Sequence, residues 1–75
     1  MTRTLDLTAI ITREGDGFVA LCSEIGIASQ GDTVEEARRN LVEALEGFFE
    51  VASEEEIAEH FTGESYVSRV QVAIG

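Results

Sequence analysis

The stretch that decides the fold of this chain is "SQGDTVEEARRNLVEAL", Ser29 to Leu45. A polar turn leads to Thr33, and Glu36 follows three residues later, which is the capping-box pattern that marks a helix start. Behind it, apolar residues recur at the spacing that places them on one helical face. They are Val34, Ala37, Leu41, Ala44, Leu45, Phe48 and Ala52. The sequence therefore predicts one amphipathic helix from Val34 to about Ala52, with Thr33 and Glu36 as its cap.

Three strand-like stretches precede this helix. Residues 5–12, "LDLTAIIT", alternate apolar and polar side chains, a pattern typical of a half-buried strand. An "EGDG" turn follows, in which Asp16-Gly17 suits positive φ, and it leads into "FVALC", which is apolar at every position. After a second turn near Glu24 to Gly26, "IASQ" predicts a short third strand. We expect these stretches to form a three-strand meander.

Two more elements are expected after the helix. Ser53 and Glu56 repeat the capping-box pattern, so "EEEIAEHF" predicts a short second helix that Gly63 ends. Residues 65–74, "SYVSRVQVAI", predict a last strand. One of its faces holds Tyr66, Val70, Val72 and Ile74, and the other holds Val67, Arg69, Gln71 and Ala73. The order β-β-β-α-α-β predicts an α+β fold of two layers in a single domain over residues 1–75, with the main helix on one face of the sheet.

Charge is the most distinctive feature of the composition. The 75 residues include 15 Asp and Glu but only 5 Lys and Arg, which gives a formal net charge of -10. An acidic surface repels phosphate backbones and anionic membranes, so we expect neither direct nucleic-acid binding nor membrane binding. The same charge attracts basic partners, although acidity also serves solubility alone.

Reactive side chains are few. Cys22 is the single cysteine, so no intrachain disulfide forms, and we expect a cytoplasmic protein. No stretch is apolar enough for a signal peptide or a membrane span. His60 is the single histidine, and the pattern supplies neither a nucleophile nor an orienting partner for it. The side chains of Glu54–Glu56 fan out about 100° apart on a helix and do not converge on one ion. We predict no catalytic residue, no metal and no cofactor.

A set of short motifs runs through the centre of the chain. It comprises Asp16-Gly17-Phe18, Glu24-Ile25-Gly26, Gly31-Asp32-Thr33, Glu35-Glu36-Ala37, and Asn40 with Glu43-Ala44-Leu45. Together these motifs resemble the core of the HicB-like antitoxin domain family. Ser23 stands where that family usually has proline, and Ala28 stands where it often has cysteine. Many members continue into a DNA-binding domain. Because this sequence ends at Gly75, we expect no operator binding.

The resemblance implies a partial ribonuclease-H-like sheet and a function as an antitoxin. Such domains bind and mask small basic HicA-type toxins, which cleave messenger RNA. We therefore expect an interaction module and not an enzyme, with Glu24, Asp32 and Glu35 as candidate partner-binding residues. One alternative is an orphan homo-oligomeric structural domain with no toxin partner. Another is a metal-dependent nuclease that uses carboxylates such as Asp6 and Glu43, although the last strand supplies no acid.

The second strand predicts self-association. Residues 18–22 are apolar on both faces of the strand, whereas one helical layer covers only one face of a sheet. A large exposed apolar patch is unusual on a monomer, and a domain this small gains stability by oligomerising. We expect a homodimer or higher homo-oligomer that uses the outer sheet face or a strand edge. The candidate interface residues are Phe18, Val19, Leu21, Ile10 and Val67, with Val19 and Leu21 central.

Overall fold

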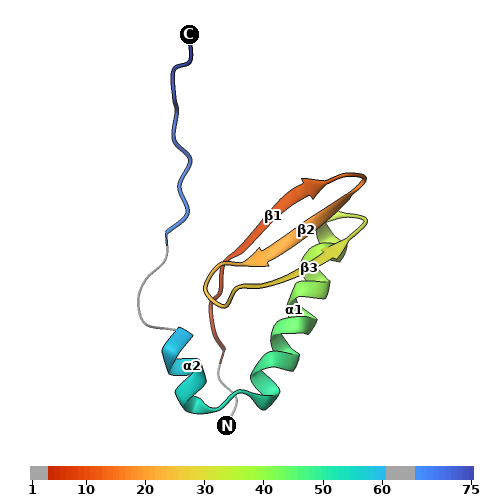
Figure 1. The fold of residues 1–75 in the computed structure, drawn as a ribbon. Coiled ribbons are helices and arrows are strands. Elements are labelled where there is room, and N and C mark those ends of the chain that lie inside the picture. The colour runs from red at the N-terminus through yellow and green to blue at the C-terminus, as the bar shows by residue number, and fades with distance from the viewer. Residues whose placement is uncertain (1–3, 61–65) are drawn as a thin grey trace.

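Three antiparallel strands and one long helix make up the two layers of this protein (Figure 1). The structure is a computed structural model that describes residues 4–60 and 66–75. Its elements are β1 (Ala9–Glu14), β2 (Gly17–Cys22), β3 (Ile27–Gly31), α1 (Val34–Val51) and α2 (Glu54–His60). Within these described residues the sheet has the order β1-β2-β3, and α1 packs on one face of it. The predicted α+β arrangement of two layers is confirmed.

The hairpin between β1 and β2 turns at Gly15 and Asp16. Gly15 has a φ of +58°, and among the described residues no side-chain-bearing residue has a positive φ. A two-residue loop with glycine in first place is the composition of a type II′ turn, whose twist suits paired strands. The prediction of positive φ at Asp16-Gly17 is therefore wrong, because the preceding glycine adopts it. Gly17 instead begins β2, where an added Cβ would lie 2.9 Å from the carbonyl oxygen of Gly31.

The hydrophobic core lies between the sheet and α1. Its buried members are Ala20, Cys22, Ala37, Leu41 and Leu45. Three of these five side chains are small, so the helix approaches the sheet closely. Ile11 in β1 and Leu7, just before β1, pack against this cluster. Their spacing of four residues agrees with the predicted alternation of side chains.

The start of α1 is fixed both by its cap and by a close contact with β3. Thr33 Oγ1 accepts a hydrogen bond from the backbone N–H of Glu36 at 3.0 Å. Glu36 Oε1 accepts one from the backbone N–H of Asp32 at 3.2 Å. An added Cβ at Gly31 would lie 2.5 Å from the backbone nitrogen of Ala37 and 2.8 Å from the carbonyl carbon of Glu36. The first turn of α1 therefore rests directly on the backbone of Gly31.

The end of the chain differs from the predicted order. Residues 66–75 belong to no strand of the sheet, and Figure 1 shows them running away from the two layers as an open chain. We call this segment the C-terminal arm. The Cα radius of gyration is 14.7 Å, whereas a compact domain of this length would have about 11 Å. A strand needs a neighbouring strand, and among the described residues of the single chain none pairs with the C-terminal arm.

Two further points concern the helices. Gly63, predicted to end α2, lies outside the described residues, and α2 is described as far as His60. In the described part of the chain, no helix combines the length and apolar character needed to cross a bilayer. α2 follows α1 after a short break and returns toward it, because the ring of His60 lies edge-to-face against Phe48 with centroids 5.8 Å apart.

The contact between α1 and Gly31 predicts opposite effects for the same substitution at two glycines. Gly31→Ala should destabilise the protein by about 1–3 kcal/mol, because the added methyl group displaces backbone atoms of the helix. Gly47→Ala should stabilise it by about 0.5–1 kcal/mol, since Gly47 is exposed within α1 and an added Cβ meets no atom within 4 Å. Urea unfolding of both variants measures the two free energies. A Gly31→Ala variant as stable as the wild type would contradict the contact.

Candidate functional site

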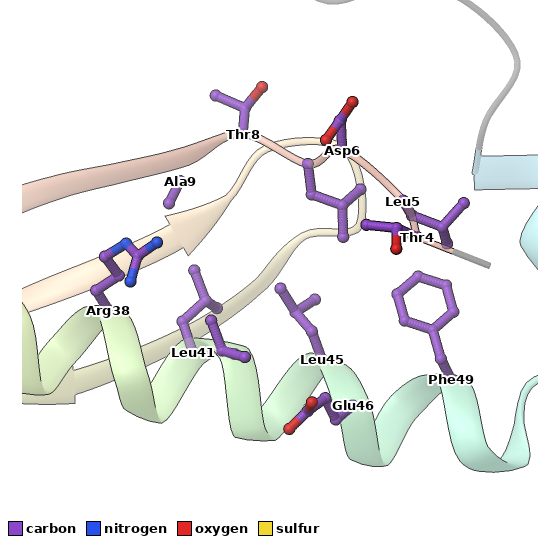
Figure 2. A pocket seen from close by; sticks show the side chains of 12 residues that line it. Thr4, Leu5, Asp6, Thr8, Ala9, Arg38, Leu41, Leu45, Glu46 and Phe49 are labelled. Atoms are coloured by element: carbon purple, nitrogen blue, oxygen red, sulfur yellow. The ribbon is translucent and has the colours of Figure 1, made fainter. Parts of the chain in front are cut away.

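A groove of about 630 Å³ lies between α1 and the residues that lead into β1. Figure 2 shows its apolar wall, with Leu41, Leu45 and Phe49 from α1 across from Leu5. Its lining comprises residues 4–9 together with Arg38, Leu41, Val42, Leu45, Glu46 and Phe49. We call this feature the β1 groove. It exists because α1 contacts β3 and β2 more extensively than β1, so one flank of the core is not covered by the helix.

The chemistry of the β1 groove suits binding better than catalysis. Asp6, Arg38 and Glu46 are exposed and add charge to a lining that is otherwise mainly apolar. Glu43, paired with Asp6 in the nuclease hypothesis, does not line the groove. Across residues 4–60 and 66–75, no three His, Cys, Asp or Glu side chains are grouped so as to hold a metal ion. The nuclease alternative therefore has no metal-binding group in the described part of the chain.

Glu24 connects two distant parts of the chain. Its Oε1 and Oε2 accept hydrogen bonds from the backbone N–H of Thr8 at 2.9 and 3.1 Å, and Oε2 also accepts one from Thr8 Oγ1 at 2.8 Å. The side chains of Ser23 and Cys22 donate to Oε1 at 3.3 and 3.7 Å. Glu24 thus ties the turn between β2 and β3 to the residues that lead into β1. We call this set of bonds the Glu24 clamp.

Both acidic groups of the Glu24 clamp have pKa values shifted from their ordinary values. Burial alone would raise the pKa of Glu24, but the hydrogen bonds from Thr8 favour the carboxylate and bring the pKa below its ordinary value. Burial raises the pKa of the Cys22 thiol, against hydrogen bonds from the backbone amides of Ile25 and Glu24 that lower it. The buried thiol therefore stays protonated at neutral pH and is a weak nucleophile.

A second hollow, of about 380 Å³, lies at the hairpin end of the sheet. Its lining comprises Glu14, Gly17, Phe18, Val19, Gln30, Gly31, Asp32 and Glu36. Three of these residues are acidic, and the lining contains no Lys or Arg. We call it the acidic recess. A Lys or Arg side chain from another molecule would find charge-assisted hydrogen-bond acceptors there.

The three candidate partner-binding residues do not lie together. Asp32 lines the acidic recess, and Glu35 is exposed on the adjacent first turn of α1. Glu24 lies beyond the opposite end of β2, within the Glu24 clamp. Sequence reasoning missed Glu14 as a recess residue, because only the strand register, which pairs Glu14 with Gly17 and Phe18 with Gly31, brings it near the helix start. The binding role of all three candidates stays a prediction.

The five candidate self-association residues divide among three places. Ile10 and Leu21 are register partners on the sheet face away from α1, where they are 37% and 39% exposed. Val19 shares that face by alternation along β2. Phe18 lies on the helix side, where it packs against the core and has the Arg13 guanidinium 4.7 Å from its ring centroid. Val67 is in the C-terminal arm.

Comparison with known proteins adds no assignment to these surfaces. No protein-family model, curated protein or solved structure matches this chain. The features of the molecule that bear on its function are the acidic surface, the acidic recess and the β1 groove.

The Glu24 clamp makes stability depend on pH. The pKa of Glu24 is lower in the folded protein than in the unfolded chain, so the ionised carboxylate stabilises the fold. This stabilisation is fully present at pH values above the unfolded-state pKa. It is lost as the pH falls through the folded-state pKa. We expect Glu24→Gln to destabilise the protein by about 1 kcal/mol at pH 7, with the gap closing in acid. Urea unfolding at several pH values measures this difference.

The matched control for this test is Glu43→Gln, the same change at an exposed position on α1. It should leave the pH dependence of stability close to that of the wild type. If Glu24→Gln and Glu43→Gln have the same effect at every pH, the clamp does not contribute to stability.

Proposed function

We propose that this protein is an acidic interaction module that binds and masks a small basic partner, in the manner of a HicB-like antitoxin with a HicA-type toxin. The observation that carries the proposal is its charge, a net -10 over 75 residues. A charge of that size on so small a domain attracts cationic surfaces over several ångströms and accelerates their association. The resemblance of the central motifs to that family supports the same function and implies a cytoplasmic setting.

The solvent face of α1 concentrates this charge. Glu35, Glu43, Glu46 and Glu50 are exposed and lie within about 80° of one another around the helix axis. Arg39 is the one cation among them, and the core residues lie on the opposite side of the helix. The acidic recess adjoins the beginning of this face through Glu36. The solvent face of α1 and the acidic recess together form an extended acidic surface. Within it, the recess is the hollow into which a Lys or Arg side chain of a basic partner fits.

Masking of a toxin follows from competition for the same charges. A protein that cleaves messenger RNA must present cationic groups to the phosphate backbone. An acidic domain that pairs with those groups prevents RNA from reaching them, without any chemical step of its own. In this mechanism the recess carboxylates of Glu14, Asp32 and Glu36 receive a Lys or Arg side chain of the partner, which fixes the orientation of the complex.

The alternative function is that of an orphan homo-oligomeric domain with no toxin partner. The β1 groove favours this alternative, since an apolar groove beside an edge strand suits an apolar segment of another protein chain better than a highly charged partner. Self-association at the β1 groove is compatible with binding of a basic partner at the acidic recess, because the two have no lining residue in common. Co-purification from the native host distinguishes a protein with a basic partner from one that associates only with itself.

The partner test uses the small basic protein that co-purifies with the wild-type chain or is encoded beside it. Its association rate should fall steeply with added salt, because the attraction is between net charges. Neutralising the recess with Glu14→Gln and Asp32→Asn should weaken binding by at least about tenfold. The control, Glu55→Gln with Glu59→Gln, removes the same charge from exposed positions on α2 and should change binding much less.

Two results would contradict the proposed function. An association rate independent of salt would show that binding rests on apolar contact and that the acidity serves solubility. Equal losses from the recess variant and the α2 control would show that the partner senses only total charge, without a defined site at the recess.

The nuclease alternative has its own test. The purified protein should leave single-stranded and duplex RNA intact with Mg²⁺ or Mn²⁺, and should not bind duplex DNA at physiological salt. Gel assays of RNA length and DNA mobility measure both. Metal-dependent cleavage that is lost on Asp6→Asn would replace the interaction module by an enzyme.

A further inference from the structure

We propose that two copies of this chain exchange their C-terminal arms, so that residues 66–75 of each copy add as a fourth strand along β1 of the other. The apolar side chains of the arm would then fill the β1 groove of the partner copy. This inference does not rest on the proposed antitoxin function. It assigns an occupant to the groove, and that occupant is a segment of the protein itself.

The C-terminal arm has the side-chain pattern of a strand that is covered on one face. Val70, Val72 and Ile74 alternate with Arg69, Gln71 and Ala73. Within the single chain, Val70, Val72 and Ile74 are 80%, 75% and 93% exposed. Isolated apolar residues on a surface are ordinary, but a row of them on an open segment indicates a surface that another element covers.

The edge of β1 is the place in the fold that can receive this strand. β1 and β3 are the two edges of the described sheet. The β3 edge lies under α1, and Asn40 Nδ2 donates a hydrogen bond to the carbonyl oxygen of Gln30 at 2.8 Å. The β1 edge has less cover from the helix and adjoins the β1 groove. A free edge with an apolar hollow beside it is the arrangement into which an extra strand pairs.

The C-terminal arm and the β1 edge are similar in length, and the apolar face of the arm suits the apolar side of the β1 groove. The ten residues of the arm would extend about 33 Å, close to the span of the eleven residues 4–14. With its apolar row turned inward, the arm would place Val70, Val72 and Ile74 against Leu41, Leu45 and Phe49 of α1, which line the groove. Its other face would then carry the polar side chains of Arg69 and Gln71 on the solvent side of the sheet.

A second copy, and not the same chain, is the partner that this geometry favours. In Figure 1 the C-terminal arm runs away from the sheet and α1 of its own chain. The long principal extent of the chain, 52 Å against 29 and 16 Å, reflects this open arrangement. Exchange of an identical element between two copies satisfies both grooves and both arms with one two-fold axis. It also shields the β1 edge, which would otherwise be open to unspecific strand pairing.

The proposal is tested first by size and by a matched pair of variants. Sedimentation of the wild-type chain should give twice the 8.1 kDa mass of one copy. Val72→Asp should raise the dimer dissociation constant by at least about tenfold, and Gln71→Asp, which adds the same charge on the other face of the arm, should change it much less. Added salt should strengthen the dimer, because two chains of net charge -10 repel each other.

The same variants separate the proposal from its competitors. Far-UV circular dichroism of Val72→Asp should keep the wild-type helix signal, since the arm lies outside the two layers of its own chain. A monomeric wild type would overturn the proposal. A dimer that Leu21→Asp breaks and Val72→Asp leaves intact would also overturn it, because the outer face of the sheet would then be the interface. Toxin binding is measured separately, so failure of the dimer leaves the antitoxin proposal to its own test.

Isotope-filtered NMR decides whether the exchange is between copies. A sample of ¹³C-methyl-labelled and unlabelled chains, mixed in urea and refolded together, reports only contacts between different molecules. We expect such contacts between the methyl groups of Val70 or Val72 and those of Leu41 or Leu45. The same contacts found only within one molecule would show that the arm closes on its own groove, and their absence would show that it does not enter the groove. Either result would overturn the exchange.

Discussion

The close approach of α1 to Gly31 is the constraint on which the rest of the structure depends. Where any other residue would place a Cβ, the backbone of Ala37 and Glu36 already lies within 2.8 Å. The helix therefore begins directly on the last residue of β3, and its cap at Thr33 closes the turn between them. From that starting point α1 runs over β3 and β2 and covers β1 least. The buried core and the β1 groove are two consequences of the same contact.

The two candidate binding surfaces follow from this placement and differ in their chemistry: one is charged and the other apolar. The side of α1 turned away from the core is acidic and charged over its whole length, which suits a cationic partner in water. The flank beside β1 is apolar and lies next to a strand edge, which suits another backbone. One small domain can therefore hold two kinds of contact that do not compete for the same residues.

Local patterns predicted the parts of the fold that depend on local physics. Periodicity and the Thr33 cap gave α1 to within one residue at its C-terminal end, because both signals lie within the helix. The positive φ of the hairpin turn was predicted at Asp16-Gly17, but Gly15 adopts it. Glycines flank Asp16 on both sides, and only the strand register, which pairs Glu14 with Gly17, decides which of them lies in the turn. The predicted last strand is absent from the described residues: 66–75 alternate apolar and polar side chains but pair with no strand, since pairing is a non-local property.

The candidate site was predictable only in part, for the same reason. Asp32 belongs to the turn before α1, so its position near the helix start was visible in the sequence. The contribution of Glu14 to the acidic recess depends on the strand register. The Glu24 clamp joins residues 16 positions apart, and no pattern around Glu24 or Thr8 indicates it.

Native-state hydrogen exchange tests the central claim most directly, because it measures where the structure opens first. If the contact at Gly31 holds the two layers together, the backbone amides of Ala37 and Leu41 in α1 and of Ala20 and Cys22 in β2 should exchange only through global unfolding, with one common free energy. If instead the amides in the first turns of α1 have a clearly lower free energy of opening than those of β2, the helix opens while the sheet stays folded. That result would contradict the dependence of the fold on this contact.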